Sequence, residues 1–219
     1  MQTNFRLKLK LATPFSLSSW LTLDSLLSAA VYNATGLVGE STIPYIPLAQ
    51  RNGIFLGSSL FYGVAHRHAP VGRIMSLRGE RDLSVRLFRP NGKKYVPILP
   101  NKGPYKFNMS AYPGIEAREA CFWGVGDKDQ AAYLISTFIP GIGKRASGGA
   151  GAIVSVAVTE SETDLSWVRA DGTPARPLPI DLWREIAGEA TAPVAEIAVR
   201  FPYWESEKVP AVFPVRPVV

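Results

Sequence analysis

Apolar and basic residues alternate strictly near the start of the chain. Residues 5–11 read Phe-Arg-Leu-Lys-Leu-Lys-Leu, and this period of two is typical of a strand with one buried face. The apolar side chains are predicted to face a core, and same-face neighbours lie about 6.6 Å apart. That spacing could follow successive phosphates of a single nucleic-acid strand, although a solvated sheet face explains it equally well. The basic side chains of this second face are Arg6, Lys8 and Lys10.

Two later segments have the apolar spacing of helices. Residues 22–34 carry a stripe at i, i+3, i+4, i+7 and i+8, with Thr22 as the expected N-cap, Asp24 in the first turn and Gly36 at the end. A second helix is predicted to begin after Asp127, which has Gln130 three positions on, as in a capping box. The two stripes consist of Leu23, Leu26, Leu27, Ala30 and Val31, and of Ala131, Leu134, Ile135 and Phe138.

Strands are predicted between and after these helices. Apolar or β-branched runs indicate strands around residues 54–62, 119–125, 152–158 and 196–203, and a short helix is expected around 181–187. Without the segment 64–118, the order is β-α-β-β-α-β, the ferredoxin-like (RRM-like) pattern of an α+β fold. We therefore expect residues 1–219 to form a single domain with one large insertion.

The insertion, about 64–118, differs from the rest in charge. Residues 83–88 alternate and lead through Arg-Pro-Asn-Gly-Lys-Lys at 89–94 into residues 95–99, which predicts a β-hairpin with a basic tip. Residues 100–113 are rich in Pro, Gly, Asn and Tyr and are expected to be irregular. Residues 51–106 hold eleven Lys/Arg and two acids, whereas residues 160–208 hold five Lys/Arg and ten acids. A concentrated basic region is typical of a polyanion-binding protein, and the acidic part is expected to be a C-terminal extension, about 160–219.

Composition narrows the chemistry. Cys121 is the one cysteine, so neither an intrachain disulfide nor a cysteine metal cluster is expected, and a reducing cytoplasm is the simplest location. No apolar run reaches the roughly 20 residues that a membrane span needs. The acids Glu160, Glu162 and Asp164 could hold a divalent ion but are more often a solvated turn. No cofactor is therefore expected.

A glycine-rich loop is the most specific local motif. Residues 141–151 read Gly-Ile-Gly-Lys-Arg-Ala-Ser-Gly-Gly-Ala-Gly, so close backbone approach to phosphates is possible, with Lys144 and Arg145 adding charge. It is not a Walker A loop, because Arg145 stands where Ser or Thr is needed. It is not a dinucleotide fingerprint either, because it runs from a helix into a strand. A flexible connection is the alternative.

A helix, a basic glycine-rich loop and an apolar strand in this order resemble the signature of the RAMP proteins of CRISPR systems. The first strand, followed by Leu-Thr-Leu-Asp-Ser-Leu-Leu at 21–27, is similar to the leucine-aspartate helix of many RAMP proteins, with Ser25 where the family usually has Gly. The best match is the small RAMP subunit of type IV effector complexes. The resemblance covers the first 35 residues, 54–62 and about 119–159, but not the acidic C-terminal part.

The resemblance implies a role as a non-catalytic RNA-binding subunit. The glycine-rich loop would hold the 5′ handle of the guide RNA, and the inserted hairpin would act as a thumb. Partners would be the guide RNA and the backbone and large subunits of the complex, with target DNA near the PAM as a further candidate. The residues expected to contact RNA are Gly141, Gly143, Lys144, Arg145, Ser147, Gly148 and Gly149 in the loop, and Arg51, His66, Arg67, His68, Arg73, Arg86, Arg89, Lys93 and Lys94 elsewhere.

One alternative is an enzyme. RAMP-like endoribonucleases can cleave RNA without metal by using His, Tyr or Lys as general acid and base. In an extended segment His66 and His68 would share a face about 6.6 Å apart, which suits either a catalytic pair or two phosphate contacts. We favour binding over catalysis, and a basic domain that binds acidic proteins is a weaker third hypothesis.

Overall fold

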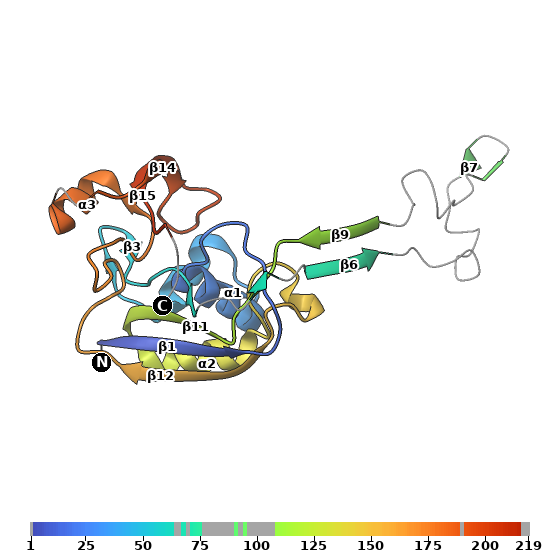
Figure 1. Cartoon of the computed structure of the whole chain (residues 1–219), viewed down its shortest axis with the longest axis horizontal. Coiled ribbons are helices and arrows are strands. Elements are labelled where there is room, and N and C mark those ends of the chain that lie inside the picture. Colours follow the sequence, from blue (N-terminus) through green and yellow to red (C-terminus); the bar gives the residue numbers. More distant parts are fainter. Residues whose placement is uncertain are drawn as a thin grey trace. The chain divides into compact units, whose positions relative to one another are not determined.

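The computed structural model describes residues 2–63, 67–68, 71–75, 90–91, 94–95, 108–188 and 191–215 (Figure 1). The chain divides into two compact units. The first consists of Met1–Ala69 and Gly114–Val219, and the second of Pro70–Pro113.

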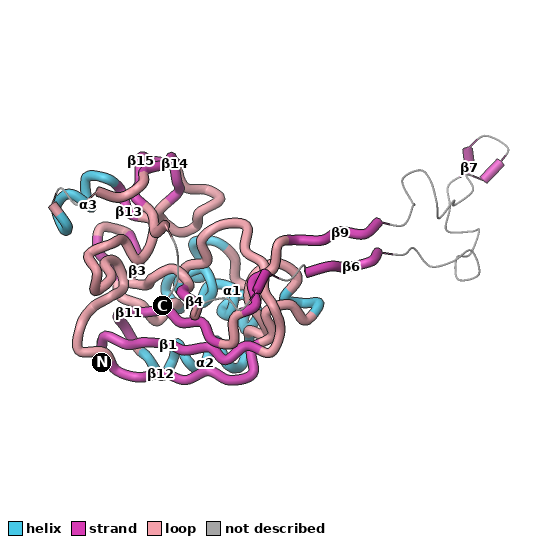
Figure 2. Tube along the Cα trace, viewed as in Figure 1, coloured by secondary structure: helices cyan, strands magenta, loops and turns pink. Residues whose placement is uncertain are grey.

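An antiparallel sheet of four strands organises the first unit, in the order β12-β1-β11-β4. Figure 2 shows β12, β1 and β11 side by side. Leu7 of β1 lies opposite Phe122 of β11 on one side and Val158 of β12 on the other. The α+β class with antiparallel sheets is thereby confirmed. The strands are β1 (Thr3–Leu11), β4 (Phe61–Tyr62), β11 (Glu119–Gly126) and β12 (Ile153–Glu160).

Two helices cover one face of this sheet. Helix α1 (Leu23–Thr35) packs against α2 (Lys128–Phe138), and α2 packs against β12 and β1. The Asp127 carboxylate accepts hydrogen bonds from two backbone N–H groups of the first turn of α2, as an N-cap should. Gly36 ends α1 in the left-handed conformation, with φ of 78°. The predicted stripes are buried in one core, together with Phe5, Leu7, Leu9, Leu11 and Phe122; only Phe138 is half-buried.

The predicted strand at 54–62 is wrong as a single element. Only β3 (Ile54–Phe55), which pairs with β2 (Gln50–Arg51), and β4 have strand pairing. Between them the backbone changes partner at each step: Ser58 N–H donates to Trp123 O, and Ser59 N–H donates to Ala175 O. These small residues carry no bulky side chain to fix one register, so the segment bonds to several neighbours in turn.

The acidic C-terminal part has its own core within the first unit. Helix α3 (Ile180–Ala187) and the three-stranded sheet β13-β15-β14 surround Trp167, Trp183 and Leu178. The predicted strand at 196–203 is only partly correct, because β14 ends at Ala198. A turn follows, in which the Pro202 carbonyl accepts backbone hydrogen bonds. The strand that contains Pro210, β15, was not predicted because this proline interrupts the strand pattern of the sequence. These strands are β13 (Leu178–Pro179), β14 (Val194–Ala198) and β15 (Lys208–Val212).

Short strands complete the description. In the first unit, β5 (Arg67–His68) pairs with β10 (Ile115–Glu116), and two 3-10 helices form at Gly39–Tyr45 and Ala146–Gly148. In the second unit, β6 (Val71–Met75) pairs with β9 (Asn108–Tyr112), so the expectation of irregular structure is wrong for that stretch. Pro90–Asn91 pairs with Lys94–Tyr95 around the expected turn. Residues 83–88 and 96–99 lie outside the described residues, and the thumb remains a prediction.

A buried ion pair joins α1 to the C-terminal part. Arg176 and Asp24 are 1% and 0% exposed, and the guanidinium Nη1 lies 3.2 Å from the carboxylate Oδ1. Nη1 also donates to the carbonyls of Phe55 at 2.7 Å and Gly57 at 3.0 Å. Asp24 is therefore a core ion-pair partner, not only a first-turn acid.

Tyr203 completes this network. Its hydroxyl accepts from Arg176 Nη2 at 2.7 Å and donates to Asp24 Oδ2. Burial raises the pKa of the Tyr203 hydroxyl, so it stays a neutral donor. Thr22 is the N-cap residue of α1, as predicted, but its hydroxyl bonds to the Tyr203 hydroxyl at 3.2 Å and not to the backbone of the helix.

Removing the charge of Asp24 should destabilise the first unit strongly. Asp24→Asn leaves the buried Arg176 guanidinium without its counter-charge, which should lower the free energy of unfolding by about 3–5 kcal/mol. Urea unfolding of the full chain measures this. Asp181→Asn is the matched control, because Asp181 pairs with Arg184 on the surface and should cost far less. Equal losses in the two variants would contradict the structural role of the pair.

Candidate nucleic-acid interface

Backbone hydrogen bonds hold the glycine-rich loop, residues 141–151, against the chain that follows β1. Lys144 N–H donates to Ser16 O at 2.7 Å, and Gly151 N–H donates to Pro14 O at 2.9 Å. The Thr13 hydroxyl bridges the two segments, since it donates to Gly149 O at 2.6 Å and accepts from Ala152 N–H at 2.9 Å. The loop therefore has a defined shape, in contrast to a flexible connection.

Its glycines fall into two sets. A Cβ on Gly143 would lie 2.4 Å from Ser16 O, and its φ of +78° disfavours any other residue. Gly141 and Gly151 are also pressed against backbone atoms. Gly148 has nothing within 4 Å of the position of a Cβ and no positive φ. The fold therefore requires glycine at position 143, whereas packing and backbone conformation place no such requirement on position 148.

The tip of the loop is basic and accessible. Lys144, Ser147, Gly148 and Gly149 are exposed, and Arg145 is half-buried. Arg145 adopts the left-handed conformation, with φ of 64°, and the 3-10 turn follows it directly. Gly148 N–H donates back to Arg145 O at 2.8 Å, so this turn sets the position of the exposed glycines beside the two cations.

A pocket of about 490 Å³ opens beside the loop. Its walls come from three segments: residues 16–21 after β1, the outer side of α1, and residues 139–147. Its lining is mostly apolar and includes Trp20 and Leu26, and serine side chains and Lys144 also line it. Apolar surface for a base next to a cation for its phosphate is a combination that single-stranded nucleic acid uses.

Among the other expected RNA contacts, Arg51 has a described side chain and does not line this pocket. Arg51 is exposed, and its guanidinium lies 5.6 Å from the centre of the Trp167 ring. Arg67 and His68 form β5, whose partner β10 is joined to Phe15 by two backbone hydrogen bonds. The backbone of β5 is thus one strand away from the segment that receives Lys144. Arg73 and Lys94 are placed by their backbone only, and His66, Arg86, Arg89 and Lys93 lie outside the described residues.

Sequence reasoning missed half of this site. Ser16, Trp20, Ser25 and Asn33 line the pocket, yet none belongs to a basic or glycine-rich motif. Their contribution depends on the loop folding back over the end of β1, which no local pattern reveals. Three serines within residues 16–19 were the one available signal.

The described residues give no sign of a metal centre or a membrane span. No cluster of three or more His, Cys, Asp and Glu able to hold a metal is found among them. Of the three acids considered above, Glu160 lies 3.4 Å from Lys128, and Asp164 accepts from Ser166 N–H at 2.9 Å. Within the same residues, no helix has the length and apolar character to cross a bilayer.

A comparison with protein families decides the identity. The model of the family described as CRISPR type IV associated protein Csf3 matches residues 73–214, more than half of the chain. The chain belongs to the Csf3 family. The resemblance to a type IV CRISPR subunit is thereby confirmed, and the match extends into the acidic C-terminal part, for which the sequence motifs gave no family pattern.

Other comparisons place this Csf3 protein less closely. No curated protein matches it. A solved structure entitled "Cryo-EM structure of the Type III-B Cmr-beta bound to cognate target RNA" shares 11% identity with a TM-score of 0.39 and covers 73% of this chain. The chain spans 61% of the length of that protein. A likeness at this TM-score is too weak to support a functional argument.

The two sets of glycines in this Csf3 protein should respond differently to alanine. Gly143→Ala places a methyl against Ser16 O at a positive φ and should lower the free energy of unfolding by about 1–3 kcal/mol. Gly148→Ala meets open space and should unfold at nearly the same temperature as the unchanged chain. Thermal unfolding followed by circular dichroism measures both. A strongly destabilised Gly148→Ala variant would show that the fold, and no ligand, requires this glycine.

Proposed function

We propose that this Csf3 protein is a non-catalytic RNA-binding subunit of a type IV CRISPR ribonucleoprotein. Its glycine-rich loop would hold the 5′ handle of the guide RNA. The observation that carries the proposal is the exposed Gly148 in the same short turn as Lys144 and Arg145, next to a pocket that Lys144 and Ser147 line. A cation and an open backbone position side by side suit a sugar-phosphate chain.

We also propose that the first unit is a ferredoxin-like scaffold of the RAMP type. The elements run β1-α1-β4-β11-α2-β12, and the sheet order is β12-β1-β11-β4. Both helices pack in the core on one face of the sheet, as expected for two β-α-β halves that share a sheet. In this arrangement the loop after α2 lies at the C-terminal end of β1, where the pocket is found.

The remaining roles are proposals of the same kind. Residues within 64–118 would form a thumb against the guide RNA, and the acidic C-terminal part would dock on neighbouring backbone or large subunits. Contact with target DNA near the PAM is a further candidate. The chain would work without a cofactor, since guide binding needs only donors, cations and stacking surfaces.

Loss of the loop cations should reduce the salt dependence of guide binding. In Lys144→Ala/Arg145→Ala, each lost phosphate contact should remove about 0.7 from the slope of log K against log salt for a single strand. Filter binding of repeat-derived RNA between low and moderate salt measures the slope. The expected change is thus about 1.4 if both cations contact phosphates.

Two controls make this result specific. Lys128→Ala removes a cation that is engaged by Asp129 and Glu160 and should leave the slope nearly unchanged. Gly148→Ala should weaken binding at every salt concentration, because a methyl obstructs the backbone without altering charge. An unchanged slope in the double variant would refute the loop as the handle site.

Catalysis gives a second, independent test. The purified protein should leave repeat RNA intact in chelator and with magnesium, as judged on denaturing gels. Site-specific cuts that disappear in His66→Ala or His68→Ala would replace the binding hypothesis with a metal-independent endoribonuclease.

A further inference from the structure

The sheet face opposite the helices carries a row of basic side chains. Arg6, Lys8 and Lys10 of β1 stand on this face, about 6.6 Å apart. On one side they are flanked by small side chains of β12, which leave the row open to solvent. The residues of β12 opposite them are exposed, namely Ser155, Ala157 and Thr159.

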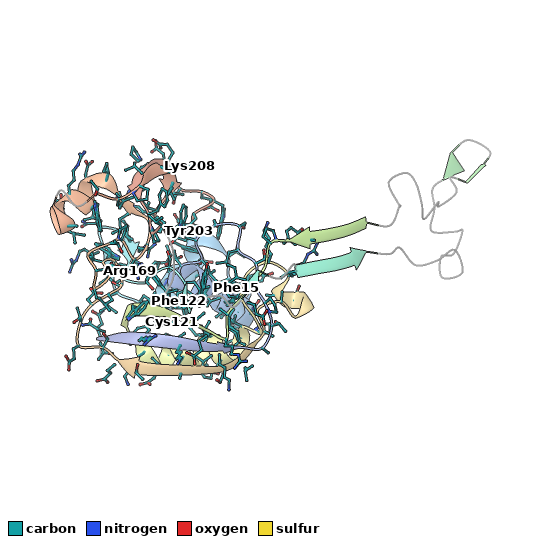
Figure 3. All side chains as sticks on the ribbon, viewed as in Figure 1. Phe15, Cys121, Phe122, Arg169, Tyr203 and Lys208 are labelled. Carbon is teal, nitrogen blue, oxygen red and sulfur yellow. The ribbon has the colours of Figure 1, made fainter. Side chains whose placement is uncertain are left out.

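On the other side the row meets an aromatic residue of β11. Trp123 lies opposite Arg6, whose guanidinium is 5.4 Å from the centre of its indole ring. Trp123 also packs edge-on against Phe61, at 5.2 Å between ring centres. Figure 3 labels two neighbours in β11, Cys121 and Phe122. Cys121 belongs to this face, and Phe122 belongs to the helix-covered core.

The guanidinium of Arg6 has spare hydrogen-bonding capacity. Its described hydrogen bond runs from Nη2 to Cys121 Sγ at 3.7 Å, and thiol sulfur is a weak acceptor. Its Nε is buried and has no partner among the described residues. A partly buried cation with unused donors is unfavourable without an acceptor. Because Nε is closed to solvent, an incoming phosphate oxygen would bond to the Nη groups, whose described acceptor is the weak Cys121 sulfur.

Two pockets flank this Arg6–Trp123 pair. One, of about 170 Å³, is lined by Arg6, Lys8 and Cys121, with Gly63 and Glu119 at its edge. The other, of about 240 Å³, has Trp123 and Leu165 as apolar walls and Arg169 beside them. The pockets are neighbours along one face of β11, because Cys121 lines the first, Trp123 lines the second, and the two residues are about 6.6 Å apart.

We infer that this face is a second binding site for single-stranded nucleic acid, separate from the handle site and not dependent on it. One base would stack against Trp123 in the larger pocket, and the adjoining phosphate would bond to Arg6 and Lys8. Stacking on an aromatic side chain together with cations that follow the backbone is the usual way in which single strands bind without sequence readout.

The charges of the face agree with this ligand. Glu119 lies 2.7 Å from Lys8 and is the acid that a phosphate must compete with; because both side chains are about half exposed, the pair is weak. Arg169 lies 3.5 Å from Asp171 and covers the ring of Phe61 at 5.1 Å. An acidic protein would be attracted by the same cations, but the Trp123 ring beside Arg6 favours a ligand that also carries bases able to stack.

The test uses the full-length chain and labelled oligo-uridine and oligo-thymidine of about ten nucleotides, which lack the handle sequence. Arg6→Gln and Trp123→Leu should each weaken binding roughly tenfold or more, as measured by fluorescence anisotropy. Arg184→Gln makes the same chemical change at an exposed position of α3 and should have little effect. Whichever probe binds more tightly assigns the site to RNA or to DNA.

The outcomes separate this site from the handle site. Lys144→Ala/Arg145→Ala should weaken the binding of repeat RNA far more than the binding of the unrelated probes. Arg6→Gln should weaken the binding of the unrelated probes far more than the binding of repeat RNA. If Trp123→Leu lowers the melting temperature, Arg6→Gln alone decides. The inference would be overturned, even if the handle site is confirmed, by either of two results. One is that Arg6→Gln changes probe binding no more than Arg184→Gln does, and the other is that neither probe binds at low salt.

Discussion

The buried pairing of Asp24 with Arg176 is the interaction on which the first unit depends. It brings together the start of α1, the carbonyls of Phe55 and Gly57, and the hydroxyl of Tyr203. A charge in a core is costly unless it is paired and hydrogen-bonded. These three segments and the segment that carries Arg176 must therefore come together for any of them to be stable there. The acidic C-terminal part is thereby integrated with the sheet and the helices.

The ion pair is linked to the glycine-rich loop by a short series of backbone hydrogen bonds. Backbone bonds from Leu23 to Ser58 and from Leu60 to Leu21 fix the entry to α1 beside the ion pair. That entry, residues 16–21, is one wall of the pocket, and Ser16 O receives the Lys144 N–H. A rigid scaffold that presents a shaped, basic loop is what binding of a flexible strand requires, because the protein then loses little conformational entropy on binding.

The sequence allowed prediction of those features that local periodicity determines. The alternation at 5–11, both helical stripes, Asp127 as N-cap and Gly36 as terminator were all readable, because each depends on neighbours within a few residues. The role of Asp24 was not, since its partner Arg176 is distant in sequence and belongs to a segment without a family motif. Likewise the glycines of the loop looked alike in sequence, whereas packing against Ser16 and a positive φ distinguish Gly143 from Gly148 in the structure. A strand interrupted by Pro210 was missed for the same reason: its pairing is tertiary.

Cross-linking of the assembled particle can show whether the glycine-rich loop holds the 5′ handle. The Csf3 protein would be purified with its co-expressed partner subunits and guide RNA, irradiated, and digested for peptide mapping. Nucleotides of the 5′ handle are expected to cross-link to peptides containing residues 144–149 or Trp20 at the pocket. Handle nucleotides that cross-link only to other subunits, with none on these peptides, would contradict this role of the loop.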